Sequence, residues 1–114
     1  MKIPLTNPSR ELKEIKNFDK TFINEIKKGV YVGGNNVEIL EKSLKTFLGS
    51  KYITTVNSGT DALYLSLLAM GIGKNDEVLV PSFTFFATVE CILNVGATPV
   101  FVDINDDTYC LDLE

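Results

Sequence analysis

Five small polar residues, Asn57-Ser58-Gly59-Thr60-Asp61, separate two segments that both have the composition of buried elements. The β-branched run 52–56 precedes them, and the almost unbroken apolar stretch 62–70 follows. A turn between a strand and a helix can bind a phosphate, because the first amides of a helix have no acceptor within it and the helix dipole favours negative charge. Gly59 permits close approach of the backbone, and the hydroxyls of Ser58 and Thr60 are further donors. The same residues also suit a plain helix cap, so the local pattern leaves both interpretations open.

The sequence gives little support for acid–base catalysis by histidine or for a metal site. The chain contains no histidine, which is the commonest acid/base catalyst and metal ligand. Its two cysteines, Cys91 and Cys110, lack metal-ligand spacing, and we expect both to be reduced thiols. Residues 103–114 match several ligand positions of an EF-hand loop, but Thr108 occupies the position that requires glycine. We therefore predict a solvated acidic loop there and no metal site.

Composition and charge restrict the class of protein. At 114 residues, with 45% hydrophobic and 23% charged residues, the chain is globular and amounts to one domain at most. The net charge is −4 and no basic run is longer than Lys27-Lys28, so we expect no nucleic-acid partner. The apolar stretch 62–70 is too short to span a membrane, and the N-terminus lacks the apolar core of a signal peptide. We therefore expect a cytoplasmic protein with no membrane partner.

Hydrophobic periodicity predicts helices and strands in alternation. The predicted elements are, in chain order, a helix from Asn7-Pro8-Ser9 to Gly29, a helix from Asn35 with Gly49 past its end, a strand 52–56, a helix 61–70, a strand 77–80, a helix 85–94 and a strand 100–104. Strands separated by helices of about ten residues are typical of βαβ units. We predict an α/β fold with a mostly parallel sheet and helices on both faces. The helix 61–70 and the side chains of Phe83 and Phe86 are expected to be buried.

Five stretches of the chain together carry a specific family resemblance. They are, in order, Gly29-Val-Tyr-Val-Gly-Gly34, Asn57-Ser-Gly-Thr-Asp-Ala-Leu63, Gly71-Ile-Gly-Lys-Asn-Asp-Glu-Val78, Val80-Pro-Ser-Phe-Thr-Phe85 and Gly96-Ala-Thr-Pro-Val-Phe-Val-Asp103. With these stretches, the chain from Pro4 to Asp112 resembles the N-terminal part of the DegT/DnrJ/EryC1/StrS family. Members of that family are pyridoxal-phosphate-dependent aminotransferases that act on nucleotide-linked keto-sugars.

The resemblance implies a fold, a cofactor and an assembly. Residues 1–114 are expected to be the N-terminal portion of the large domain that binds pyridoxal 5'-phosphate (PLP) in an aspartate-aminotransferase-like fold, PLP fold type I. The rest of that domain and the C-terminal small domain are then absent from the chain. The resemblance also implies a homodimer.

The resemblance further assigns roles to five residues. Gly59, Thr60 and Asp61 fall where the family holds the cofactor phosphate, and Phe85 falls where an aromatic ring stacks on the pyridine face. Tyr31 lies in a loop that we expect near the dimer interface, where it approaches the neighbouring subunit or its substrate. From the sequence alone, an exposed loop aromatic explains Tyr31 equally well.

The covalent chemistry of this family is not expected within the chain. The Schiff-base lysine of the family lies in the part that follows Glu114, and the resemblance therefore assigns no catalytic residue here. Lys51 and Lys74 are expected to be solvated, and a solvated lysine is a poor nucleophile. Two functions remain open. One is transfer of an amino group, from an amino acid such as glutamate to a nucleotide-linked keto-sugar, as part of a longer enzyme. The other is a non-catalytic truncated remnant or a phosphate-binding or regulatory module.

Overall fold

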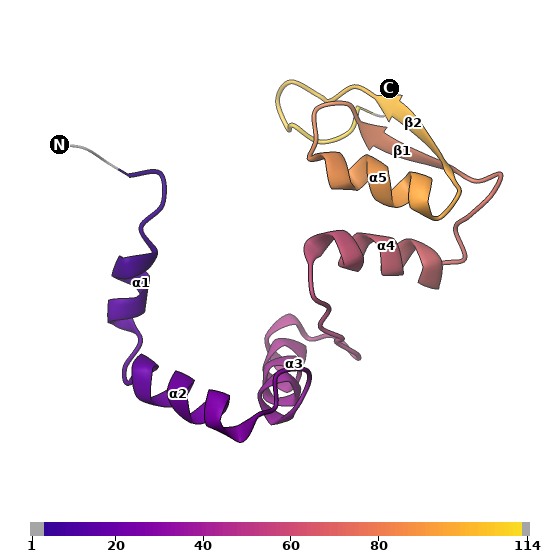
Figure 1. Cartoon of the computed structure of the whole chain (residues 1–114). Coiled ribbons are helices and arrows are strands. Elements are labelled where there is room, and N and C mark those ends of the chain that lie inside the picture. Colours follow the sequence, from indigo (N-terminus) through magenta and orange to yellow (C-terminus); the bar gives the residue numbers. More distant parts are fainter. Residues whose placement is uncertain (1–3, 113–114) are drawn as a thin grey trace. The chain divides into compact units, whose positions relative to one another are not determined.

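The structure is a computed structural model that describes residues 4–112, and it divides into two compact units. The first unit, Met1–Thr54, contains the helices α1 (Pro8–Glu14), α2 (Phe18–Lys28) and α3 (Asn35–Leu48). The second unit, Thr55–Glu114, contains α4 (Gly59–Ala69), β1 (Glu77–Pro81), α5 (Phe86–Asn94) and β2 (Thr98–Val102) (Figure 1). The prediction that all of residues 1–114 belong to one large domain stays a prediction.

The prediction of a single helix from Pro8 to Gly29 is wrong, because the helix is interrupted between α1 and α2. Ile15 has extended backbone angles (φ −85°, ψ 108°), and Asn17 is left-handed (φ 58°). Asparagine adopts this conformation more readily than most residues, which explains why a break is tolerated at Asn17. The apolar spacing of the sequence nevertheless continues from α1 into α2, where Phe18 stacks on Phe22 with ring centroids 5.7 Å apart. Periodicity alone therefore did not indicate the interruption.

Helix α3 ends where the sequence predicts, at the left-handed Gly49 (φ 64°), whose amide donates to the Lys45 carbonyl. Asn35 with Glu38 three residues later predicts Asn35 as the cap of this helix, and that detail is wrong. Gly34 is the residue that precedes the first turn, and Asn35 is already helical.

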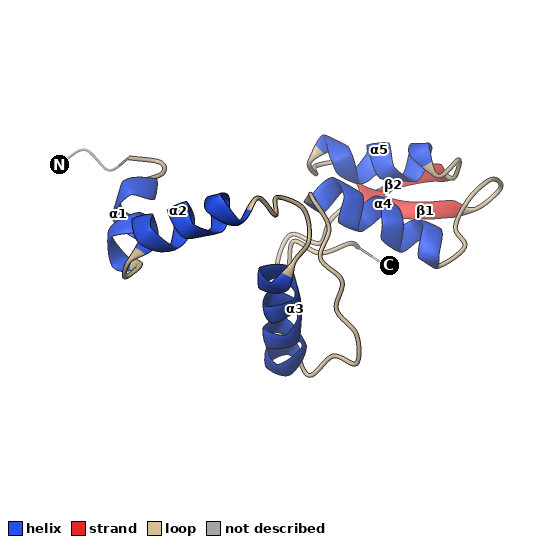
Figure 2. Ribbon diagram, turned by 60° about the horizontal axis from the view of Figure 1, so that its bottom comes forward, coloured by secondary structure: helices blue, strands red, loops and turns tan. Residues whose placement is uncertain are grey.

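The predicted βαβ unit is confirmed in the second unit. Strands β1 and β2 are parallel and pair in register from Glu77↔Thr98 to Pro81↔Val102, with α5 as the crossover between them. Helix α5 packs against both strands and α4 packs against α5 (Figure 2). The core consists of Val80, Ile92 and Ala97. The partly buried side chains packed against it come from α4, β1, α5 and the segments that follow the two helices: Leu67, Ile72, Val78, Val89 and Val95. The α/β fold with a parallel sheet is thereby confirmed.

The predicted strand at residues 52–56 is wrong. This segment has no regular secondary structure, and within residues 4–112 the only strands that pair in a sheet are β1 and β2. A strand needs hydrogen bonds from a neighbouring strand, so a β-branched composition by itself does not produce one. Strand β2 also begins two residues earlier than predicted, and its Pro99 lies opposite Val78.

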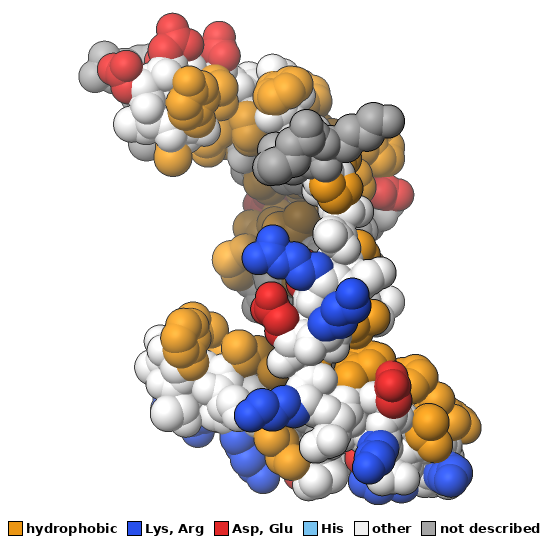
Figure 3. Space-filling model, turned by 90° about the vertical axis from the view of Figure 1, so that its left-hand side faces the viewer, with side chains coloured by type: hydrophobic (Ala, Val, Ile, Leu, Met, Phe, Trp, Pro, Cys, Tyr) orange, Lys and Arg blue, Asp and Glu red, His pale blue; other side chains and the backbone are white. Residues whose placement is uncertain are grey.

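Several apolar side chains predicted to be buried are exposed. Leu63, Leu65 and Leu68 of α4 retain 44–46% of their surface, whereas Phe83 and Phe86 retain 92% and 70%. Figure 3 shows hydrophobic side chains on the visible surface beside the charged ones. Burial requires a covering segment as well as an apolar side chain, and the described part of the chain does not cover these positions.

Candidate functional site

The start of helix α4 is shaped by Ser58. This residue is extended (φ −154°, ψ 162°), and its Oγ accepts a hydrogen bond from the amide of Asp61 at 3.0 Å. The same hydroxyl donates to Asp61 Oδ2 at 3.0 Å, and the Ser58 carbonyl accepts from the amide of Ala62 at 3.1 Å. The capping interpretation is therefore confirmed for Ser58, which fixes the direction in which the chain enters the helix.

The amides of Gly59 and Thr60 occupy the first two positions of α4. Amides at these positions have no acceptor within an α-helix, and they lie at the positive end of the helix dipole. A Cβ atom built on Gly59 would meet no described atom within 4 Å, so the space beside this residue is open. The first turn of α4 can therefore accept an anion without rearrangement of the backbone.

Asp61 differs from its two neighbours in what it can contribute. Its amide is used by Ser58 Oγ, and its carboxylate accepts from the Ser58 hydroxyl. A carboxylate cannot donate to a phosphate and repels it electrostatically. Asp61 therefore supports the first turn through Ser58, and the donors available to a phosphate are those of Gly59 and Thr60.

Helix α5 adds a residue to this site that the sequence did not single out. The Cys91 side chain is 1% exposed, and its Sγ donates to the carbonyl oxygen of Thr60 at 3.2 Å. An open hollow of about 350 Å³ beside this contact is lined by Thr60, Asp61, Tyr64, Cys91 and Asn94. The four-residue spacing of the buried Ala87 and Cys91 in α5 was the available signal. It indicates the buried face of α5, but it does not indicate the contact with α4.

Phe85 precedes the first turn of α5, close after the carboxyl end of β1. Its backbone is extended (φ −64°, ψ 137°) and its side chain is 78% exposed. In α/β sheets, ligands bind at the carboxyl ends of the strands, so this position suits a ring that contacts a ligand. Phe83 and Phe86 are exposed to a similar degree. Exposure alone therefore does not distinguish Phe85 from its neighbours, and its role stays a prediction.

Tyr31 lies in the first unit, in the loop between α2 and α3. Its side chain is 76% exposed, and its hydroxyl donates to the carbonyl oxygen of Ile26 at 3.3 Å. The role predicted for Tyr31 at a dimer interface stays a prediction. Lys51 and Lys74 are both exposed, as expected, and Lys51 Nζ lies 5.3 Å from the centre of the Tyr52 ring.

The acidic segment near the C-terminus forms an ordinary turn in its described part. Asn105 Oδ1 accepts hydrogen bonds from the amides of Asp107 and Thr108, both at 3.1 Å. Among residues 4–112 there is no group of three His, Cys, Asp or Glu side chains placed to bind a metal ion. The same residues include no helix with the length and apolar character needed to cross a membrane.

A parallel β1–α5–β2 unit packed on a helix with an open first turn defines an α/β protein suited to binding a phosphate at a helix start. The model of the DegT/DnrJ/EryC1/StrS aminotransferase family matches residues 13–114, and the chain belongs to this family. The family resemblance found in the sequence is thereby confirmed.

Comparison with three similar proteins shows which share of their length this chain covers. The UDP-2-acetamido-2-deoxy-3-oxo-D-glucuronate aminotransferase of Pseudomonas aeruginosa is 40% identical over 96% of this chain and 30% of its own length. A crystal structure of a DegT/DnrJ/EryC1/StrS aminotransferase from Brucella abortus is 36% identical, with a TM-score of 0.89 over 97% of this chain and 30% of that one. NtdA from Bacillus subtilis, with bound cofactor PMP, is 35% identical, with a TM-score of 0.86 over 97% and 26% of the two chains. The chain therefore spans less than a third of each of these proteins.

Proposed function

We propose that this chain is part of a homodimeric PLP-dependent enzyme that transfers an amino group from glutamate to a nucleotide-linked keto-sugar. Membership of the aminotransferase family and the similarity to an aminotransferase of a UDP-linked 3-keto sugar support the reaction type. The observation that carries the proposal is the open first turn of α4, where Gly59 and Thr60 present donors to an anion. Both cysteines are free thiols, which supports a reducing, cytoplasmic location.

The residues of this turn fit the phosphate of PLP. A phosphate dianion needs several hydrogen-bond donors and positive potential, and the amides of Gly59 and Thr60, the Thr60 hydroxyl and the α4 dipole supply both. The bound PMP in NtdA, which is the amino form of PLP, agrees with this choice of cofactor. Once bound, PLP supplies the electron sink that amino transfer requires.

Other residues of the chain would position the cofactor and the turn that binds it. The Phe85 ring is exposed at the carboxyl end of β1 and can cover one face of the flat, electron-poor cofactor ring. The thiol of Cys91 and the hydroxyl of Ser58 hold the first turn of α4 in place from two sides. The covalent step needs a desolvated lysine, and we expect it beyond Glu114, because Lys51 and Lys74 are exposed.

The proposal is tested with the full-length protein, PLP, glutamate and a UDP-linked 3-keto sugar. We expect the nucleotide sugar to gain an amino group in place of its keto oxygen, which raises its mass by about one unit, and 2-oxoglutarate to form in equal amount. A full-length protein that binds PLP but forms neither product contradicts the aminotransferase proposal. That result favours the phosphate-binding or regulatory alternative.

A further inference from the structure

Helix α4 contacts the rest of its unit through different kinds of interaction at its two ends. Near the C-terminal end of the helix, the side chain of Leu67 packs against the hydrophobic core. Near the start, the carbonyl oxygen of Thr60 accepts a hydrogen bond from Cys91 Sγ at 3.2 Å. Cys91 belongs to α5, and both helices lie in the same compact unit, so this bond is part of its internal packing.

Side-chain packing supports the first turn of α4 only in part. The open hollow of about 350 Å³ lies beside Thr60 and Cys91, and both residues line it. Side chains of α5 do not fill this space, so the first turn has fewer dispersion contacts there than a closely packed helix would have. The bond from the buried Cys91 is therefore important for where the first turn lies.

The peptide group between Thr60 and Asp61 is held at both of its ends. Its carbonyl oxygen accepts from Cys91 Sγ, and its N–H, which is the amide of Asp61, donates to Ser58 Oγ at 3.0 Å. A peptide group is planar, so bonds at its two ends fix the direction of the plane. Only the two backbone angles of Thr60 separate this group from the preceding one, which carries the Thr60 amide. Holding one peptide group therefore restricts the direction of the other.

The two bonds to this peptide group have different origins. Ser58 is the residue that enters the helix, so its bond shapes the turn locally. Cys91 lies 31 positions further along the chain, beside the buried Ile92, and its bond relates the turn to the β1–α5–β2 unit. A thiol is a weak donor. We therefore expect the bond to affect the direction of the amides in the first turn more than the unfolding of the protein.

We propose that Cys91 is a positioning residue for the cofactor phosphate. Its thiol holds the peptide group between Thr60 and Asp61, so that the amides of Gly59 and Thr60 stay directed at the phosphate of PLP. Cys91 does not touch the cofactor and acts only through Thr60. The inference rests on the proposed function for its ligand, whereas the ordering of the first turn depends on the bond between Cys91 and Thr60 alone.

The test compares three variants of the full-length protein. Cys91→Ala removes the donor, whereas Cys91→Ser keeps a donor on a side chain of similar size. The control Ile92→Val shortens the neighbouring buried side chain, which is 3% exposed, and leaves the bond to Thr60 in place.

Three measurements separate the turn from the cofactor and from global stability. Absorbance titration of the cofactor-free protein gives the Kd for PLP, and thermal unfolding gives the Tm. Hydrogen exchange by mass spectrometry reports on the amides of Asp61 and Ala62, which donate to Ser58 at the start of the helix.

For Cys91→Ala we expect the Kd for PLP to rise about threefold or more, with faster exchange of the Asp61 and Ala62 amides in the cofactor-free protein. Cys91→Ser should stay within about twofold of the wild type in both measurements, because its hydroxyl replaces the thiol as donor. Ile92→Val should lower the Tm but keep the wild-type Kd and the wild-type exchange at these two amides.

Unchanged exchange in Cys91→Ala overturns the ordering of the turn, and faster exchange with an unchanged Kd overturns the role toward PLP. Equal effects of Cys91→Ala and Cys91→Ser, or an equally raised Kd in Ile92→Val, would show that packing rather than the hydrogen bond is responsible, and would also overturn it. A protein with the expected changes in Kd that forms no aminated sugar supports the role of Cys91 but contradicts the proposed reaction. A wild-type protein that binds no PLP contradicts the proposed cofactor and overturns the role of Cys91 toward it.

Discussion

Substitution of Gly59 by valine separates cofactor binding from folding. The backbone of Gly59 is helical rather than left-handed, and a Cβ atom there would meet no described atom within 4 Å. Gly59→Val is therefore expected to change the free energy of unfolding by no more than about 0.5 kcal/mol. If a phosphate lies against the first turn of α4, however, the valine side chain occupies part of the space it needs.

The expected loss of affinity follows from the hydrogen bonds at stake. A hydrogen bond to a charged group contributes about 1.5–3 kcal/mol, so loss of one amide–phosphate bond weakens binding about tenfold to a hundredfold. The assay is an absorbance titration of the cofactor-free, full-length protein with PLP. Thermal unfolding of the same cofactor-free samples measures stability.

Gly71, past the other end of α4, is the matched control. Its φ of 77° is unfavourable for any residue with a side chain, so Gly71→Ala should destabilise the fold by about 1–2 kcal/mol while the folded fraction binds PLP normally. Wild-type PLP affinity in Gly59→Val would refute phosphate binding at this turn. A loss of stability in Gly59→Val as large as in Gly71→Ala would show that the space beside Gly59 is not open.

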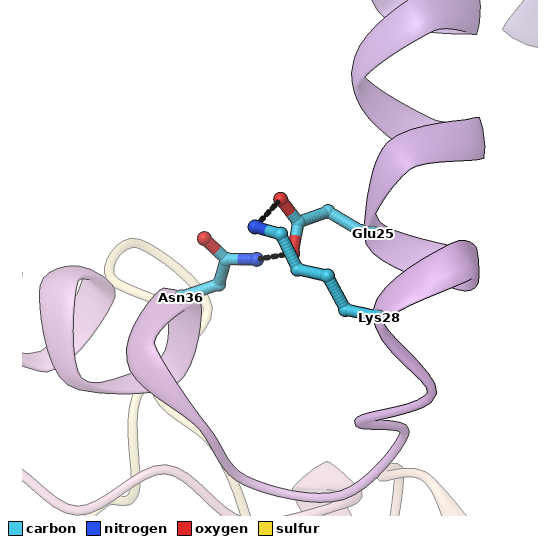
Figure 4. Close-up of polar contacts among 3 residues, drawn as sticks. All are labelled: Glu25, Lys28 and Asn36. Atoms are coloured by element: carbon cyan, nitrogen blue, oxygen red, sulfur yellow. Dashed lines mark hydrogen bonds and ion pairs between the residues drawn. The ribbon is translucent and has the colours of Figure 1, made fainter.

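Three further predictions concern single side chains. Phe85→Ala should weaken PLP binding by about 1 kcal/mol through lost stacking and leave the stability of the cofactor-free protein unchanged. Val80→Ala, at a position 1% exposed, should instead lower the free energy of unfolding by about 2 kcal/mol. Equal melting temperatures for the two cofactor-free variants would contradict this prediction. Ser58→Ala should lower the free energy of unfolding by about 1 kcal/mol, measured by chemical denaturation. Ser58→Thr keeps a capping oxygen and should lower it less, so equal losses for the two variants would argue against the cap. The hydrogen bond from Lys28 lowers the pKa of Glu25 in the folded state (Figure 4). Its stabilising contribution, which is small because the pair is exposed, is therefore present above the pKa of an unfolded glutamate and is lost as the pH falls through the folded value. The stability difference between wild type and Glu25→Gln should therefore shrink on acidification from pH 7 to pH 3, and a constant difference would contradict this.

The parts of the fold that the sequence predicts well depend on local signals. Gly49 ends α3 as predicted, because glycine adopts the left-handed conformation that a helix end requires. The crossover β1–α5–β2 is also correct, since short apolar strands around a helix of about ten residues leave few alternatives. The Ser58 cap can also be predicted from the sequence, because the residue whose amide it accepts from, Asp61, is only three positions away.

The parts that the sequence did not predict depend on partners distant along the chain. The segment 52–56 has the composition of a strand, but no described strand pairs with it in a sheet. Phe83 has the apolar character of a core residue, but the described part of the chain does not cover it. The bonds from Cys91 to Thr60 and from Asn36 to Glu25 join residues 31 and 11 positions apart, so no local pattern indicates them.

A crystal structure of the full-length protein with PLP tests most directly the claim that the start of α4 holds the cofactor phosphate. We predict phosphate oxygens within hydrogen-bond distance of the amide nitrogens of Gly59 and Thr60, with the Phe85 ring against the face of the pyridine. A phosphate held elsewhere in the protein, with the first turn of α4 facing solvent, would contradict the account.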